Sequence, residues 1–133
     1  MGVKANMLPA HLPAELADGV FPAGCPSRTV LDHITSKWGV LILVALSEGE
    51  QRWSDLRRRA EGISEKMLAQ TLKTLERDGL VLRTARPVIP PHVDYSLTDR
   101  GYELTVLLVP LVTWAYNNAG DILSAQADQK DQR

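Results

Sequence analysis

The sequence predicts a mostly helical α+β domain in which two short helices are followed directly by a β-hairpin. Three observations lead to this prediction. Two helix-like segments are joined by the short turn Glu61–Ile63, the apolar spacing changes from helical to alternating after Gly79, and a long C-terminal segment is apolar around most of a helical surface. With 133 residues, 44% of them hydrophobic and 23% charged, the chain has the size and composition of one globular domain.

Composition divides the chain into three parts. Residues 1–24 contain scattered prolines and lack clear periodicity, and we expect them to form an N-terminal arm. Residues 25–124 carry the periodic apolar patterns and are predicted to form the folded domain. Residues 125–133 are polar and without periodicity, which predicts a disordered tail.

The folded part is predicted to begin with two helices. Ser27 is suited to cap the first, and the second spans Trp38–Leu46 and stops near Gly49. The first helix has one apolar face, whereas the second is apolar almost all round, which predicts a central core helix. The apolar face of the first helix consists of Val30, Leu31 and Ile34.

A pair of short helices follows, each opened by a serine that is suited to capping. Ser54 is predicted to cap a helix that runs to about Ala60, and Ser64 to cap a helix that ends at Asp78, before Gly79. The second helix of the pair divides clearly into two faces. Its inner face consists of Met67, Leu68, Thr71, Leu72 and Leu75, and its outer face of Glu65, Lys66, Ala69, Gln70, Lys73, Thr74 and Arg77.

Beyond Gly79 the residues alternate between two faces, as strands do. Residues 80–86 and 92–97 are predicted to form a hairpin, and the prolines within 87–91 place its turn there. A last helix begins at Thr98 and runs to Asn117 or beyond, with a kink at Pro110. A helix pair, a tight turn and a hairpin in this order predict a winged helix-turn-helix with a two-stranded wing.

Fold and local charge together indicate duplex DNA as the partner. The net charge is -1, but the segment Glu50–Arg86 holds nine Lys or Arg and six Asp or Glu, so one basic stretch lies on an otherwise acidic chain. The second helix of the pair is expected to enter the major groove, where Gln70 would pair with adenine and Lys66 with guanine or a phosphate. The residues predicted to contact DNA are Ser54, Arg57, Arg58, Ser64, Lys66, Gln70, Lys73, Thr74, Arg83, Arg86 and His92.

The last predicted helix carries apolar side chains around nearly its whole circumference. One small domain cannot bury every side of a terminal helix, so we expect a homodimer in which a second chain covers the rest of this helix. Two-fold symmetry would set the two DNA-reading helices about 34 Å apart, which matches a palindromic operator. The predicted interface residues on this helix are Leu104, Leu107, Leu108, Leu111 and Trp114.

Five segments resemble those of HxlR-type regulators, which are related to the MarR group. They are CPSRTVLDHI at Cys25–Ile34, KWGVLIL at Lys37–Leu43, RWSDLRR at Arg52–Arg58, GISEKMLAQTLKTLERDGLV at Gly62–Val81 and PPHVDYSLTDRG at Pro90–Gly101. The resemblance covers about two-thirds of the chain. It implies a dimeric bacterial or archaeal repressor or activator of transcription whose terminal helices form the dimer interface. Val88 and Ile89 depart from it, because many relatives have a charged or polar residue at the wing tip.

Cys25 is the single cysteine, and it lies at the start of the first predicted helix. Amide groups at a helix N-terminus stabilise a thiolate, and the resemblance implies that some relatives sense oxidants or electrophiles through a cysteine at this position. With no second cysteine in the chain, a disulfide would join two subunits or capture a small thiol. The alternative interpretation is a cysteine that only packs.

A small-molecule effector bound near the dimer helices is the alternative hypothesis for the signal. Trp38, Trp53 and Trp114 would line its pocket, although large aromatic residues at helical spacing more often belong to the core. A second alternative is a winged helix that is used only for protein contact, but the polar outer face of residues 64–78 lacks the aromatic or aliphatic anchors of such a surface.

Other classes of function find no support in the sequence. It has no glycine-rich phosphate loop, HExxH motif or nucleophile elbow, so we expect neither enzyme activity nor a cofactor. His11, His33 and His92 lack metal-ligand spacing, which predicts no metal site. The longest apolar run, Val40–Leu46, is far shorter than the ~20 residues that span a bilayer, and no export signal opens the chain. We therefore expect a cytoplasmic protein without a membrane partner.

Overall fold

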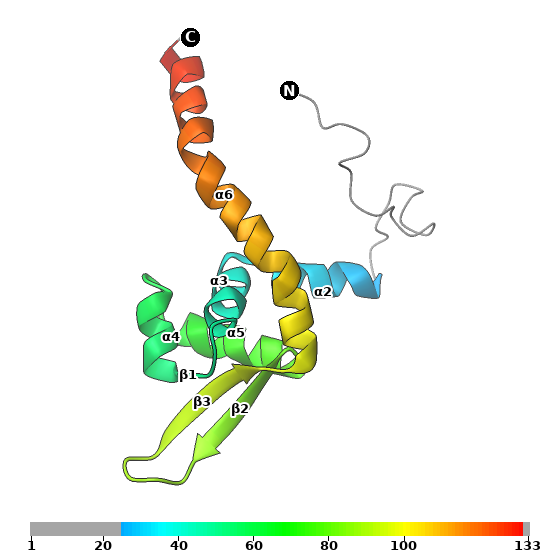
Figure 1. The fold of residues 1–133 in the computed structure, drawn as a ribbon, viewed down its shortest axis with the longest axis vertical. Coiled ribbons are helices and arrows are strands. Elements are labelled where there is room, and N and C mark those ends of the chain that lie inside the picture. The colour runs from blue at the N-terminus through cyan, green and yellow to red at the C-terminus, as the bar shows by residue number, and fades with distance from the viewer. Residues whose placement is uncertain (1–24, 132–133) are drawn as a thin grey trace. The chain divides into compact units, whose positions relative to one another are not determined.

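The computed structural model describes residues 25–131, in two parts that comprise residues 25–32 and 33–131. Along these residues the elements follow the order α2, α3, β1, α4, α5, β2, β3 and α6 (Figure 1). Within residues 33–131, three helices pack beside a small antiparallel sheet and a long C-terminal helix follows, which confirms the winged helix-turn-helix fold. The predicted N-terminal arm and His11 lie outside the described residues.

Helix α2 (Pro26–Ile34) begins earlier than the sequence predicts. The carbonyl oxygen of Cys25 accepts the N–H groups of Arg28 at 3.0 Å and Thr29 at 3.4 Å, so the helix starts directly after Cys25. Proline suits the first helical position because its missing N–H would have no partner there. The prediction that Ser27 caps this helix is therefore wrong, and Ser27 lies inside it.

Helix α3 (Lys37–Leu46) forms the centre of the core, as its apolar composition predicts. Ser36 caps it, since its Oγ accepts the N–H of Gly39 at 3.1 Å. Gly39 is required here, because a Cβ at this position would lie 2.5 Å from the carbonyl oxygen of His33. The core side chains that are fully buried are Ile42, Leu43, Leu46, Leu56, Leu68, Leu72 and Leu75.

Helix α4 (Trp53–Arg59) follows a short strand, β1 (Gln51–Arg52), that the sequence does not reveal. Arg52 occupies the N-cap position and makes no side-chain capping bond, so the prediction that Ser54 caps this helix is wrong. β1 pairs with β3, with Arg52 opposite Asp94. Two residues are too few to show strand alternation, and their pairing is a long-range contact.

Helix α5 (Glu65–Arg77) begins and ends as predicted. The Oγ of Ser64 accepts the N–H of Met67 at 3.0 Å, and Gly79 has the positive φ of 75° that ends the helix. Four residues of the predicted inner face are buried, but Met67 is 38% exposed. It lies in the first turn of the helix, one residue before the fully buried Leu68.

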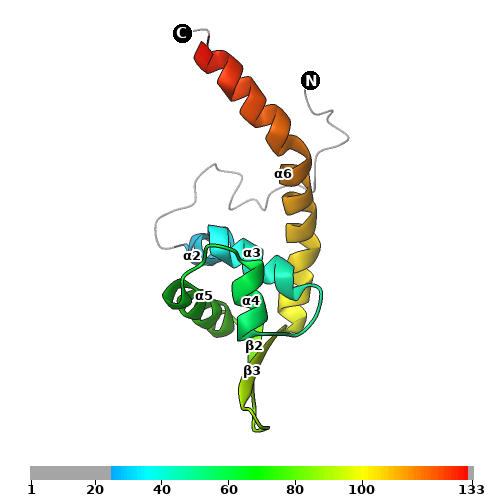
Figure 2. The ribbon, with the colours of Figure 1, turned by 90° about the vertical axis from the view of Figure 1, so that its left-hand side faces the viewer.

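The sheet has three antiparallel strands in the order β1-β3-β2 rather than two. β2 (Val81–Arg86) and β3 (His92–Leu97) pair from Val81 opposite Leu97 to Arg86 opposite His92. Leu80, which the sequence placed in the strand, lies just before it. The hairpin projects away from the helices of residues 33–131, in the direction opposite to α6 (Figure 2).

Helix α6 (Asp99–Asp131) is longer than predicted. Thr98 opens it, because its Oγ1 accepts the N–H of Gly101 at 3.1 Å and donates to the carbonyl of Gly79 at 2.6 Å. The helix continues through Pro110 and through residues 125–131, where the sequence predicts a disordered tail. Its first part packs against α3, and its second part extends beyond the core (Figure 1).

In the described part of the chain, no single helix has the length and hydropathy that a membrane crossing needs. Helices α2 and α3 reach these values only as a pair, and half of the residues of α3 are buried.

Candidate functional site

The exposed face of α5 carries the amide and the two lysines that the sequence singles out. Lys66, Gln70 and Lys73 are exposed, and Thr74 is half-buried. Among residues 25–131, neither lysine has an ion-pair partner. The opposite face, which includes Leu68 and Leu72, packs into the core. Burial of one face therefore turns the Gln70 amide and the two lysine ammonium groups toward the outside, where a ligand can reach them.

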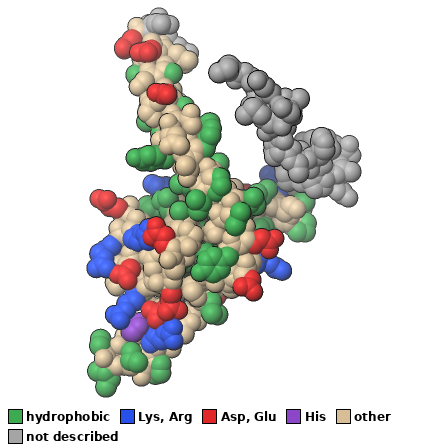
Figure 3. All heavy atoms as spheres, in the orientation of Figure 1, with side chains coloured by type: hydrophobic (Ala, Val, Ile, Leu, Met, Phe, Trp, Pro, Cys, Tyr) green, Lys and Arg blue, Asp and Glu red, His purple; other side chains and the backbone are tan. Residues whose placement is uncertain are grey.

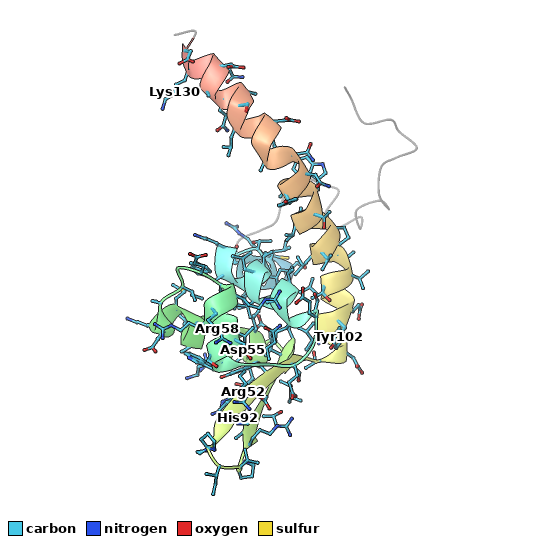
Figure 4. The ribbon with its side chains drawn as sticks, turned by 60° about the vertical axis from the view of Figure 1, so that its left-hand side comes forward. Arg52, Asp55, Arg58, His92, Tyr102 and Lys130 are labelled. Carbon is cyan, nitrogen blue, oxygen red and sulfur yellow. The ribbon has the colours of Figure 1, made fainter. Side chains whose placement is uncertain are left out.

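The arginines of α4 are exposed but engaged with carboxylates. Arg57 pairs with Glu65 of α5 at 2.8 Å, Arg58 pairs with Asp55, and Arg59 pairs with Glu48. Figure 4 shows Arg58 and Asp55 side by side on α4. Arg59 lowers the pKa of the Glu48 carboxyl by hydrogen bonding and by its charge. Exposed ion pairs contribute little free energy, so a phosphate can compete for these arginines.

Arg86 holds the wing together next to its tip, where it lies opposite His92. Its Nε donates to Asp94 Oδ2 at 2.8 Å, and a terminal nitrogen donates to Glu50 at 3.1 Å. The side chain of Asp94 is only 10% exposed, and the hydrogen bond from Arg86 lowers the pKa of its carboxyl. His92 Nε2 lies 3.4 Å from the same Asp94 oxygen. Two of the predicted DNA contacts, Arg86 and His92, are thus drawn into an internal network.

Arg83 on β2 is exposed, and within the described residues it has no ion-pair partner. It lies at the junction of two open cavities of about 360 and 520 Å³, which share Trp53, Arg83 and Tyr95. The smaller cavity joins Lys73 of α5 to Arg83 of the wing. The remaining residues of the smaller cavity are Ala69, Leu72 and Glu76, and those of the larger are Arg52, Ser54, Pro90, Pro91, His92 and Val93.

Some of the predicted DNA contacts line the two cavities, and others lie outside them. Lys73 and Arg83 line one cavity, and Ser54, Arg83 and His92 line the other. Lys66 and Gln70 stand on α5 outside both cavities. Sequence analysis missed Arg52 and Tyr95, because no local pattern shows that β1 lies beside β3. In Figure 3, Lys and Arg side chains alternate with Asp and Glu side chains over the helices and along the hairpin, while hydrophobic side chains cover the hairpin tip.

The predicted dimer residues on α6 divide into two groups. Leu108 is 5% exposed and Leu104 is half-buried, and both pack against the core of this chain. Leu107, Leu111 and Trp114 are 55% to 68% exposed, so the single chain leaves them uncovered. The sequence list omitted further exposed hydrophobic residues on the same helix, namely Val106, Tyr116, Ile122 and Leu123.

Cys25 is half-buried, directly before α2. Hydrogen bonds from the backbone N–H groups of Ser27 and Arg28 lower the pKa of its thiol.

Of the three tryptophans proposed for an effector pocket, Trp53 lines both cavities described above, whereas Trp38 and Trp114 line neither. His33, which lacks metal-ligand spacing in the sequence, bonds through Nδ1 to Asp78 at 2.7 Å. Within residues 25–131, no cluster of His, Cys, Asp or Glu side chains could hold a metal ion.

A family model described as HxlR-like helix-turn-helix matches residues 33–122, which include α3, the α4–α5 pair, the wing and most of α6. The chain belongs to this family. It is therefore an HxlR-like transcriptional regulator with a helix-turn-helix, as its resemblance to the family predicts.

Relatives of this HxlR-like chain match between 71% and 92% of it. The HTH-type transcriptional regulator YtfH of Escherichia coli is 49% identical over 92% of this chain and 98% of its own. A solved structure of the transcriptional regulator ytfH from Salmonella typhimurium is 52% identical, with a TM-score of 0.74 over 77% of this chain and 92% of that one. A solved structure of the redox regulator HypR in its oxidised form is 34% identical, with a TM-score of 0.66 over 71% of this chain and 97% of that one.

Proposed function

We propose that this regulator binds duplex DNA with sequence preference, with the first half of α5 in the major groove and the wing against an adjacent phosphate backbone. The observation that carries the proposal is the free face of α5. Lys66, Gln70 and Lys73 are exposed on a helix whose N-terminus is capped, and they have no partner in the part of the chain that the structure describes. Arg83 adds a free cation on the wing, on the other side of the cavity that Lys73 lines.

A gel-shift titration tests this proposal with DNA from beside the protein's own gene. We expect binding at low salt and a steep loss of affinity as salt rises, because phosphate contacts release counterions. The variant Lys73→Ala should reduce the salt slope by about 1. The control Lys130→Ala, near the far end of α6 (Figure 4), should leave the slope unchanged. Binding to a protein partner but to no duplex at low salt would contradict the proposal and favour a protein-contact module.

The proposed active form is a homodimer that acts on a palindromic operator in the cytoplasm. Its support is the uncovered apolar surface of α6, where Leu107, Leu111 and Trp114 are exposed in the single chain. A second copy related by a two-fold axis would cover this surface and would present two copies of α5 to successive turns of one face of DNA.

Oxidation of Cys25 is the proposed signal. The thiol has a lowered pKa at the start of α2, and one relative of similar fold is a redox regulator. In the proposed reaction, the thiolate adds to the N=N bond of a diazene oxidant. A second thiol then attacks the sulfur of Cys25, which forms a mixed disulfide and releases the diazene as the hydrazine, reduced by two electrons and two protons.

Diamide treatment with added glutathione tests the signal. We expect it to change the DNA affinity of the wild-type protein but not that of Cys25→Ser. An equal response in both proteins would exclude Cys25. No response in either would favour a small-molecule effector, for which the cavities beside Trp53 offer space.

A further inference from the structure

The tip of the hairpin is the part of the candidate surface that the proposed function leaves unexplained. Residues 87–91 have the sequence PVIPP and carry no charge. Ile89 is 99% exposed, more than any other large hydrophobic residue in the described part of the chain, and Val88 is 51% exposed. Single exposed hydrophobic residues are common on proteins, but here two of them form the end of a projecting element.

The tip is held rigidly. The pair Arg86 and His92 closes the ladder directly before it. Arg86 also binds Asp94 and Glu50, which ties the tip end of the ladder to the segment before β1. Three of the five tip residues are prolines, which fix φ and offer no N–H group. A side chain presented in this way loses little conformational entropy when a partner covers it.

The charge beside the tip favours nucleic acid as its partner. Pro90 and Pro91 line the larger cavity together with Arg52 and Arg83. Figure 4 shows Arg52 and His92 close together at the hairpin. The nearby carboxylate, Asp94, is already bound by Arg86. An uncharged tip that projects beyond two arginines fits a groove of DNA, in which phosphates line both edges and the base edges form the floor.

We propose that Ile89, supported by Val88 and the tip prolines, enters the minor groove as an apolar wedge that partly unstacks one base step and bends the duplex. The wedge rests on the DNA binding proposed above. Isoleucine and proline are among the side chains that minor-groove proteins insert between base steps. Pyrimidine–purine steps unstack most easily, so the wedge adds a preference for such a step beside the sequence that α5 reads.

Selection and bending experiments test the wedge. Duplexes are selected from a random-sequence pool with full-length wild-type protein and with Ile89→Ala, and the bend of a selected duplex is measured by energy transfer between dyes at its ends. We expect a pyrimidine–purine step to be enriched on the flank only with the wild type. Ile89→Ala should bend the duplex less and bind it about tenfold more weakly, since one buried aliphatic side chain is lost.

Leu82→Ala is the matched control, because Leu82 is an aliphatic residue of β2 that is 54% exposed and lies away from the tip. It should bind and bend DNA as the wild type does, and thermal unfolding should show that both variants fold. If the wild type enriches no duplex, the proposed DNA binding fails, and the wedge fails with it. If duplexes are enriched but Ile89→Ala bends them equally, only the wedge is overturned.

Discussion

At the scale of single residues, the structure separates cations that are free from cations that are already paired. Lys66, Lys73 and Arg83 have no carboxylate partner within the described residues, whereas Arg86 binds two. A free cation can bind a phosphate with the release of counterions alone, but a paired one must first break its own hydrogen bonds. We therefore expect α5 and Arg83 to provide DNA affinity and Arg86 to stabilise the wing.

Gln70→Ala is expected to relax base preference. The Gln70 amide is exposed on α5 and has no hydrogen-bond partner among residues 25–131, so a bidentate bond to adenine is available to it. Its loss should cost about 1–3 kcal/mol on the preferred duplex and much less on random DNA. Gel-shift titrations on both duplexes measure the difference. Arg58→Ala serves as the control and should weaken both about equally; unchanged selectivity in Gln70→Ala would contradict the placement of the reading face.

Asp94→Asn is expected to destabilise the protein at neutral pH but not in strong acid. Arg86 lowers the pKa of the Asp94 carboxyl in the folded state, so the ion pair contributes stability above the unfolded pKa of about 3.9 and loses it as the pH falls through the lower, folded value. Urea unfolding should show that the wild type has a higher free energy of unfolding than Asp94→Asn above about pH 4. This difference should disappear below that pH. The control Asp121→Asn, on the exposed part of α6, should have the same free energy of unfolding as the wild type. If Asp94→Asn remains less stable than the wild type in strong acid, that result would count against the ion pair.

At the scale of elements, the two helices of the pair begin in different ways. Ser64 caps α5 through its side chain, whereas α4 starts at Trp53 without a side-chain cap and leaves Ser54 inside the helix. Pairing of Arg52 with β3 fixes the entry to α4 instead. The exposed N-terminus of α5 therefore depends on a local bond, and that of α4 on the sheet.

Ser64→Ala is expected to lower the free energy of unfolding by about 1 kcal/mol, because the N–H of Met67 loses its acceptor. Ser54→Ala is the matched control, and since Ser54 caps nothing, alanine should change stability little at that position. Urea denaturation of both variants gives the two values. Equal losses in the two variants would mean that capping does not distinguish these serines.

At the scale of the whole molecule, α6 divides into a part that packs on the core and a part that is exposed. Its first turns bury Thr105 and Leu108 against the core of the same chain, and its remaining residues are almost all exposed. A helix of 33 residues is far longer than one small domain can cover. We therefore expect the residues that the core leaves exposed to meet a second chain.

The double variant L107E/W114E is expected to be a folded monomer. Both side chains are more than half exposed in the single chain, so the core loses nothing, while a dimer interface would bury four new charges. Sedimentation should show half the wild-type mass, and operator affinity should fall about 100-fold or more as two-site binding is lost. Leu82→Glu should stay dimeric. A monomeric wild type, or a variant that stays dimeric, would refute this interface.

By itself, the sequence determined the type and order of the main elements, the cap of α5 and the polar face of that helix. These depend on local signals, namely serine and glycine at helix ends and the period of the apolar residues. Only the tertiary structure decided that β1 adds a third strand, that Arg86 is bound by Asp94 and Glu50, and that Leu108 is buried while Leu107 is free. The physical reason is the same in each case: strand pairing, ion pairing and burial join residues that are far apart in the chain, and no local pattern records which of them meet.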